Sequence, residues 1–230
     1  QEPMFAGAAS RAEQARTYSP GSLRPETARA LYGAELHFSS SRIDVLAGCR
    51  FAHFLQYGLR AQEREPAEFD SRFYGTFVHD VLEYIVQQTE REGGFAAVPR
   101  GRVQELAQER MEQNAQTLLE TFPDSGRTGY LLRRTFDEVT QVVDELYDEL
   151  SVSAFRPKFC ELEFSARGAL PGVAFAGERC RGVVEGFVDR VDVWQSGGRP
   201  YVRVVDYKTG KKSFDYTNVL HGRGLQMLLY

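Results

Sequence analysis

Two acids and a lysine near the end of the chain could form a site for hydrolytic chemistry. An apolar pair at residues 204–205 precedes Asp206 and Lys208, and a second apolar run at residues 186–193 carries Asp189. Because side chains alternate between the two faces of a strand, Asp206 and Lys208 are expected on one face, roughly 6.5 to 7 Å apart. Pairing of the two strands would bring Asp189 to that face. Two carboxylates beside an ammonium group suit Mg²⁺ and predict metal-dependent hydrolysis of a phosphodiester bond.

The strand that delivers the acid and the lysine is predicted to be central in its sheet. Val204 and Val205 make both of its faces apolar, and the two charges then lie where a central strand ends, which is a common place for functional sites. A charge without a partner at that place would be costly. On the neighbouring strand, Arg190 and Asp192 alternate to the face opposite Asp189 and are expected to pair with each other.

Three further polar residues lie on predicted helices. His79 is surrounded by apolar residues; a lone histidine in that setting is usually part of the core, but Gly75 before it permits close approach of another segment. Gln226 and Tyr230 are four residues apart at the end of the chain, so they should share one face of the last helix. Alone, neither observation indicates a function.

The elements that must position these residues change in type along the chain. Apolar spacing predicts a helical N-terminal half, several strands from about residue 158 onward, and a closing helix. The predicted helices cover residues 25–32, 41–57, a stretch beginning at Asp70 or Ser71, 101–122, 128–152 and 217–230; the predicted strands cover residues 159–166, 172–175, 183–194 and 201–207. Residues 196–199, with two glycines, are a predicted hairpin turn. We therefore expect an α/β (α+β) fold, with residues 101–152 forming an antiparallel helical pair.

Composition excludes some classes of protein and leaves others open. The 230 residues carry a formal net charge of −4 and 42% hydrophobic residues, and no apolar run approaches the roughly 20 residues that span a bilayer. No membrane association is expected, and a cytoplasmic location is predicted because the N-terminus lacks the apolar core of a secretory signal. The acidic balance does not indicate nucleic-acid binding, nor does it exclude it. The three cysteines have no close spacing and are expected to be reduced thiols.

Four blocks occur in an order that resembles a known family. Residues 75–79, 186–189, 206–208 and 226–230 resemble the motifs of the RecB-like branch of the PD-(D/E)XK nucleases. Within that branch the pattern is most similar to the C-terminal nuclease domain of the AddB (RexB) family. The resemblance covers residues 38–230 and leaves residues 1–37 as a linker arm. It implies a restriction-endonuclease-like fold, in which helices flank a mixed central sheet.

The resemblance also implies roles for individual residues. His79, Asp189 and Asp206 would bind Mg²⁺ or Mn²⁺, and Lys208 would stabilise charge at the phosphate or position the attacking water. Gln226 and Tyr230 would support the catalytic site. The implied function is that of a Mg²⁺-dependent DNA exonuclease module in a bacterial helicase-nuclease that acts in double-strand break repair and recombination. The implied partners are DNA and an AddA-like helicase-nuclease subunit.

An iron-sulfur cluster is a further implication of the resemblance. Cys49 matches the first of four cysteine ligands to a 4Fe-4S cluster, although Arg50 stands where a proline is common. Cys160 and Cys180 match no ligand position, and the chain reaches Tyr230 before the other three ligands would occur. A cluster is therefore expected only in a longer, full-length protein, of which this chain would be a piece truncated at its C-terminus.

Two alternatives remain open at this stage. The same fold could grip DNA without cutting it, or the chain could be a RecB-like nuclease of a phage or of CRISPR adaptation. The presence of His79, Asp189, Asp206 and Lys208 favours an enzyme, and the helical insertion at residues 101–152 favours AddB. The sequence contains no GxxxxGK[ST] motif, so any ATP hydrolysis must come from elsewhere.

Overall fold

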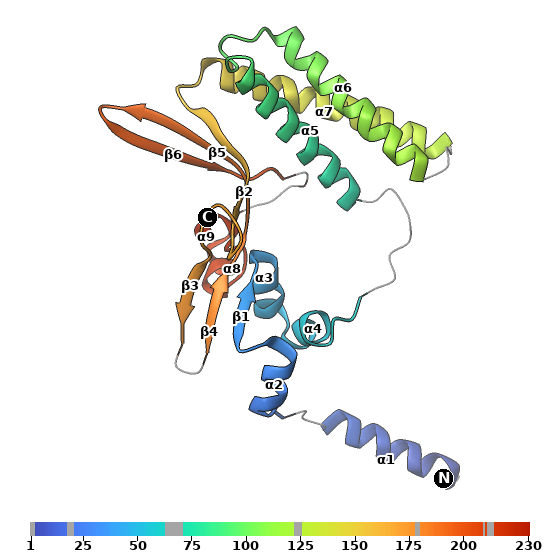
Figure 1. The fold of residues 1–230 in the computed structure, drawn as a ribbon. Coiled ribbons are helices and arrows are strands. Elements are labelled where there is room, and N and C mark those ends of the chain that lie inside the picture. The colour runs from blue at the N-terminus through green and yellow to red at the C-terminus, as the bar shows by residue number, and fades with distance from the viewer. Residues whose placement is uncertain are drawn as a thin grey trace.

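The computed structural model describes residues 3–17, 21–62, 71–121, 126–177, 180–208, 210 and 214–230. Helices form one half of the molecule and two small sheets with short helices form the other (Figure 1). The mixed α/β class predicted from the sequence is confirmed.

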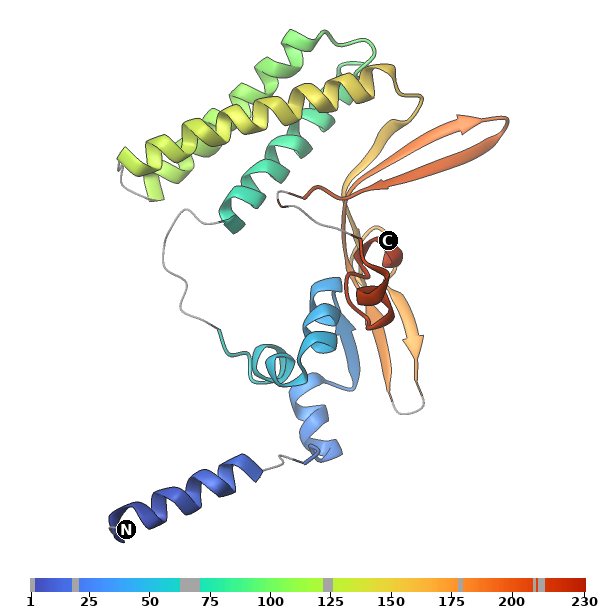
Figure 2. The same cartoon turned by 180° about the vertical axis from the view of Figure 1, so that it is seen from behind.

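A three-helix body is built from α5 (Ser71–Arg91), α6 (Arg100–Thr121) and α7 (Gly126–Val152). α6 and α7 lie side by side and antiparallel, as predicted, and α5 packs between them and the sheet (Figures 1 and 2). The apolar faces of the three helices form the larger core, whose least exposed members are Val81, Leu82, Ile85, Val86, Phe95, Val103, Val139 and Val143. The start of α5 at Ser71 agrees with the prediction, whereas Asp70 lies outside the described residues.

The first sheet is antiparallel, in the order β2 (Arg156–Phe164), β5 (Gly186–Ser196) and β6 (Arg199–Val205). The predicted hairpin joins β5 to β6, and Gly197 and Gly198 both have positive φ angles of 57° and 72°. Glycine adopts this conformation without steric cost, and it suits a two-residue hairpin turn.

The prediction that the strand before Asp206 is central is wrong. Among the strands of the described residues, β5 is the middle strand of this sheet and β6 is at its edge. The edge position leaves the Val202 side chain 61% exposed. β-Branched residues pack well on a half-exposed pleated surface too, so the valines of β6 could not distinguish a central strand from an edge strand.

The second sheet has the order β1 (Glu35–Phe38), β4 (Arg181–Val184) and β3 (Val173–Ala176). β1 is parallel to β4 and β3 is antiparallel to it, so this sheet is mixed. β4 leads directly into β5 through Glu185, so the two three-stranded sheets follow one another along the chain. The single central sheet expected from the resemblance is thus divided in two.

The N-terminal part consists of α1 (Pro3–Thr17), α2 (Pro25–Tyr32), α3 (Ser40–Gly48), α4 (Arg50–His53) and the π-helix η1 (Phe54–Gly58). Both views show α1 projecting away from the other elements (Figures 1 and 2). The helix predicted at residues 41–57 is broken at Cys49, whose backbone is extended, while Ser39 caps its start by accepting a hydrogen bond from Arg42 N. β1 crosses the expected domain boundary between residues 37 and 38. The division of the chain into a linker arm and a nuclease domain stays a prediction.

The closing helix predicted at residues 217–230 is wrong in extent, because it is divided into α8 (Tyr216–Leu220) and α9 (Gln226–Leu229). Gly222 and Gly224 separate the two with φ angles of 76° and 65°. The Gly224 N–H donates to Asp44 Oδ1 at 2.8 Å, which attaches the turn to α3. Two left-handed glycines and a tertiary hydrogen bond therefore replace the middle of the expected helix.

No helix in the described part of the chain is both long and apolar enough to cross a bilayer.

Candidate metal centre

Three carboxylates lie at neighbouring positions of the first sheet, two of them on β2 and β5 and the third just beyond the end of β6. Glu161 on β2 lies opposite Asp189 on β5, because the residues on either side of them pair in register. On the other side of β5, the last pair of the ladder joins Arg190 to Val205, and Asp189 and Asp206 come one residue beyond it. Residues opposite one another on adjacent strands have side chains close enough to interact. The fold therefore gathers two acids from adjacent strands and a third from the residue that follows β6.

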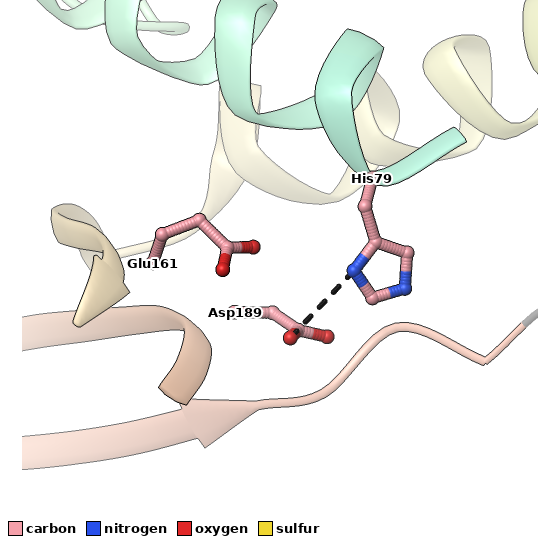
Figure 3. A group of neighbouring side chains, drawn as sticks. All are labelled: His79, Glu161 and Asp189. Atoms are coloured by element: carbon pink, nitrogen blue, oxygen red, sulfur yellow. Dashed lines mark ion pairs between the residues drawn. The ribbon is translucent and has the colours of Figure 1, made fainter. Parts of the chain in front are cut away.

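His79 reaches these acids from α5. Its Nδ1 lies 3.7 Å from Asp189 Oδ1, and one ligand atom from each of His79, Glu161 and Asp189 lies within 4.8 Å of the others (Figure 3). Figure 3 shows the imidazole descending from the helix and the two carboxylates pointing toward it from the strands. The Asp189 side chain is 10% exposed and that of His79 is 29% exposed. One imidazole and two carboxylates converge, which is a donor set suited to a divalent cation.

Burial and neighbouring carboxylates dominate the electrostatics of Glu161 and Asp189. Burial raises the pKa of Glu161, and the neighbouring Asp189 carboxylate raises it further. Burial also raises the pKa of Asp189, and the charge of Asp206 adds to that effect, although the Tyr207 N–H and His79 oppose it. Bringing like charges together in a partly buried place is costly without a compensating cation. A divalent ion would supply that compensation.

A second cluster surrounds Asp206. Its side chain is 5% exposed and accepts Lys208 Nζ at 2.6 Å, and Gln226 Nε2 donates to its Oδ1 at 2.7 Å. Gln226 also lies 3.2 Å from the Tyr230 hydroxyl, so these two residues share one face at the chain end, as expected. The four polar groups are thus joined in one hydrogen-bonded network beside the other two acids.

Phe164 and Tyr230 pack beside Gly186 of β5. A Cβ built there would lie 3.0 Å from the Phe164 ring and 3.4 Å from the Tyr230 hydroxyl. The rings of Phe164 and Tyr230 meet edge to face, with centroids 5.4 Å apart. The absence of a side chain at residue 186 therefore allows the Phe164 ring to pack closely on β5, and this ring in turn contacts Tyr230.

Residues 37–230 match the PD-(D/E)XK nuclease superfamily. The chain belongs to this superfamily. The site described above is therefore the candidate centre of a PD-(D/E)XK nuclease. Glu161 and Asp189 lie within β2 and β5, and Asp206 and Lys208 follow the end of β6.

Curated relatives of this nuclease are named as the B subunit of an ATP-dependent helicase/deoxyribonuclease. The protein of Moorella thermoacetica is 36% identical over 211 residues, which is 90% of the chain and 18% of that relative. The proteins of Pelotomaculum thermopropionicum and Caldanaerobacter subterraneus subsp. tengcongensis are 34% and 33% identical, again over 90% of the chain and 18% of the relative. The chain thus spans about a fifth of the length of these relatives.

The structure brings together most of the residues singled out in the sequence of this nuclease. His79 and Asp189 meet in the candidate metal centre, whereas Asp206 is not in the group whose ligand atoms lie within 4.8 Å of each other. Asp206 is held instead by Lys208 and Gln226. The predicted role of Asp206 as a third ligand remains a prediction.

Glu161 is the site residue that the sequence analysis of this nuclease missed. It has a positive φ of 46°, which is uncommon for a residue other than glycine. Strained backbone of this kind is often found at functional sites. The sequence offered only an acid within a predicted strand, and its partner on β5 depended on a strand register that no local pattern specified.

A cavity of about 480 Å³ opens beside the centre of the nuclease. His79 and Glu161 line it together with Gly75, which permits close approach to the helix at this point. Asp80 also lines the cavity and receives two hydrogen bonds from Arg110, at 2.6 and 2.7 Å. The cavity gives solvent access to the imidazole and the Glu161 carboxylate.

The cysteines of the nuclease do not contribute to this centre. All three are free thiols; Cys49 and Cys180 are exposed, and burial raises the pKa of Cys160 to about 11. Within the described ranges no cysteine joins a group of three or more candidate metal ligands. Cys49 caps α4 by accepting the N–H of Ala52.

Proposed function

We propose that this chain is the nuclease module of a bacterial helicase-nuclease and that it hydrolyses phosphodiester bonds of DNA with the help of a divalent cation. The observation that carries the proposal is the convergence of His79, Glu161 and Asp189 beside the Asp206–Lys208 pair. Membership of the nuclease superfamily and the name of the relatives support the same activity.

The donor set fits Mg²⁺ or Mn²⁺. His79 offers a nitrogen, and Glu161 and Asp189 offer hard oxygen donors whose pKa values are raised by burial and by neighbouring carboxylates. A bound divalent ion would polarise a phosphoryl oxygen and lower the pKa of a water molecule. We propose Asp206 as a further ligand, because it is adjacent to Asp189 across the end of the β5–β6 ladder.

The lysine has the position expected of a group that meets the substrate. Its side chain is 33% exposed, in contrast to the 5% of Asp206, so the ammonium is accessible from solvent. We propose that Lys208 contacts the scissile phosphate and stabilises the negative charge that develops there. Gln226 retains its hydrogen bond to Asp206 and holds the carboxylate in place when the lysine engages the phosphate.

The wider role is proposed from the relatives. Exonuclease action on DNA ends during double-strand break repair and recombination would take place in a larger protein, because the chain spans 18% of the length of the subunits that it resembles. An AddA-like partner subunit would then complete the helicase-nuclease, a cytoplasmic location would follow from that role, and Cys49 would be a ligand to a 4Fe-4S cluster in the larger protein.

Cleavage of linear double-stranded DNA tests the proposal. The protein in its native assembly should degrade the DNA with Mg²⁺ or Mn²⁺ and stop when EDTA is added. Asp189→Asn should abolish this degradation while leaving DNA binding measurable by gel shift. If the unaltered protein binds DNA and leaves it intact with either metal, the chain is a non-cleaving DNA-binding module instead.

A further inference from the structure

A second cavity, of about 460 Å³, lies among α2, α3 and the end of η1. Aromatic and cationic side chains line it, namely Tyr32, Arg42, Tyr57 and Arg60, together with Gln56. None of its lining residues is shared with the cavity beside the candidate metal centre. In Figures 1 and 2, α2 and α4 lie in the lower half of the molecule and the helical body in the upper half. The volume is within the roughly 300–1,000 Å³ of small-molecule sites.

Arg42 brings a positive charge to this cavity and is held there by neutral groups. Its Nε–H donates to His53 Nε2 at 3.2 Å, and its Nη1 donates to the His37 carbonyl at 2.7 Å. Burial, together with the charge of Arg42, lowers the pKa of His53, so this imidazole is mostly neutral near pH 7. The guanidinium carbon also lies 4.8 Å from the ring centroid of Tyr57 and 6.0 Å from that of Tyr32. Each of these partners leaves the charge of Arg42 unbalanced.

The Arg42 guanidinium keeps donors for a ligand. Its described hydrogen bonds use Nε and Nη1, which leaves the N–H groups of Nη2 without a described partner. Within the described ranges no carboxylate forms an ion pair with Arg42 or Arg60. A half-buried arginine with neutral partners and an open cavity beside it favours an anion. The planar fork of a guanidinium matches the oxygens of a phosphate in particular.

Arg60 adds a second cation to the cavity from an unusual backbone position. It is exposed and has a positive φ of 55°. Among the described residues the only other non-glycine residue with a positive φ is Glu161, in the candidate metal centre. This conformation costs energy and is often found at functional sites. Residues 21–62 hold five arginines against three acids, an excess of +2, in a chain whose net charge is −4. The cavity therefore lies in a basic part of an acidic chain.

The aromatic rings give the cavity walls that suit a nucleic-acid base. The rings of Tyr32 and Tyr57 pack against His53, with centroids 5.5 and 5.1 Å apart, and His53 is only 6% exposed. The buried imidazole therefore holds both tyrosines, which themselves remain half-buried. Sites for single-stranded DNA combine cations that meet the backbone with aromatic rings that stack on bases. This cavity offers both kinds of group.

We propose that this cavity binds one nucleotide of a single DNA strand, outside the candidate metal centre. Arg42 and Arg60 hold the phosphate, and the base packs against Tyr32 or Tyr57. The choice of DNA as the source of the nucleotide rests on the proposed function. A free nucleoside phosphate has the same recognition chemistry, so the experiments separate the two sources. Binding here needs no divalent cation, because the arginines supply the positive charge.

Binding of a short oligodeoxythymidylate in EDTA tests the proposal without cleavage. Fluorescence anisotropy of the labelled oligonucleotide gives the association constant of the full chain at several salt concentrations. Arg60→Gln should weaken binding and reduce the slope of log association constant against log salt concentration by about 0.7, the contribution of one phosphate contact to a single strand. Arg60 is the residue to replace, because Arg42 also attaches α3 to β1 and α4.

Arg133→Gln is the matched control, because it removes an exposed arginine from α7 and changes the net charge equally. Its slope should equal that of the unaltered chain. Equal slopes for Arg60→Gln and the unaltered chain overturn the proposal, as do equal losses of slope in the two variants.

Photocrosslinking to the unaltered chain tests the place of the base directly. An oligonucleotide that carries 5-iododeoxyuridine reacts with aromatic side chains packed against the base, and mass spectrometry of the digested adduct should place it on Tyr32 or Tyr57. Adducts found only on other residues overturn the proposal. Unlabelled dTMP should compete less well than unlabelled oligodeoxythymidylate at the same nucleotide concentration. Equal competition assigns the cavity to a free nucleotide and overturns the assignment to a DNA strand.

This proposal and the proposed function fail separately, because the oligonucleotide is bound without a metal ion. A chain that binds the strand through Arg60 but cuts no DNA with Mg²⁺ or Mn²⁺ would overturn the proposed function alone. A chain that cuts DNA but binds the strand independently of Arg60 would overturn the assignment of the cavity alone.

Discussion

Glu161 lies directly across the β2–β5 ladder from Asp189, and their carboxylates share the space beneath His79. The pairing joins two strands that are separated in the sequence by β3 and β4. Burial raises the pKa values of both acids; the Asp189 charge adds to the effect on Glu161, and the Asp206 charge adds to the effect on Asp189. A divalent cation would offset this repulsion.

Replacing Glu161 by glutamine should weaken metal binding. The change keeps the shape of the side chain but removes its charge and one hard oxygen ligand, so we expect the Mn²⁺ dissociation constant to rise by roughly tenfold or more, on the scale of altered metal ligation. Calorimetric titration of the full chain with Mn²⁺ measures the constant.

Glu163→Gln is the matched control for that change. Glu163 is on the same strand but accepts a hydrogen bond from the Ser165 hydroxyl at 2.6 Å and is outside the group of candidate ligands. Its variant should bind Mn²⁺ as the unaltered chain does. If both glutamine variants titrate alike, Glu161 is not a ligand.

Loss of the lysine ammonium should separate metal binding from cleavage. We expect Lys208→Ala to reduce the rate of Mg²⁺-dependent DNA cleavage by about 10²-fold or more, because a charge aimed at the reacting phosphate is removed. Mn²⁺ affinity should persist, since Lys208 offers no ligand. Asp206→Ala should likewise abolish cleavage.

Lys158→Ala provides the comparison for Lys208→Ala, because Lys158 is an exposed residue of β2 and its loss changes the net charge equally. Cleavage should be unaffected by it. If Lys208→Ala cleaves DNA as fast as the unaltered chain, the lysine does not have the proposed role. If both variants cleave DNA more slowly, the effect is a general electrostatic one.

Local signals in the sequence were sufficient for most elements, and the resemblance named two of the three residues that meet in the candidate metal centre, His79 and Asp189. Periodicity predicted α6, α7 and the β5–β6 hairpin, and the i, i+4 spacing placed Gln226 and Tyr230 on one face. These features depend on residues close in sequence, where the chain itself restricts the geometry. The pairing of Arg190 with Asp192 was foreseen for the same reason.

The remaining features depend on contacts between distant segments. Glu161 meets Asp189 only through the register of β2 on β5. β6 is an edge strand because, among the described residues, β5 is the one strand that pairs with it. The break between α8 and α9 is fixed by the hydrogen bond from Gly224 to Asp44. No spacing within one segment specifies such contacts.

The imidazole of His79 should be required for metal binding. His79→Ala removes a nitrogen ligand from a side chain that is 29% exposed, so we expect a weaker Mn²⁺ isotherm with only a small loss of stability. His37→Ala is the control, because His37 is exposed and pairs with Glu185 outside the centre, at 2.9 Å. If the His79→Ala isotherm matches that of the control, His79 is a structural residue and not a metal ligand.

The Asp80–Arg110 pair should make stability depend on pH in a predictable direction. Burial alone would raise the pKa of Asp80, but hydrogen bonds from Arg110 and Asn114 and the arginine charge outweigh it and lower the pKa. An acid whose pKa is lower in the folded chain stabilises the fold at pH values above its unfolded pKa of 3.8, and this stabilisation is lost as the pH falls through the folded pKa.

Asp80→Asn should therefore lower the free energy of unfolding by about 1 kcal/mol near pH 7, a modest amount because the pair is partly exposed. Urea unfolding should show this difference shrinking toward zero as the pH is lowered below 3.8. Asp137→Asn removes an exposed carboxylate from α7. This variant should show no comparable decrease in the free energy of unfolding near pH 7 or below pH 3.8. A cost for Asp80→Asn that stays constant as the acid is protonated would mean that the pair does not stabilise the joint between α5 and α6.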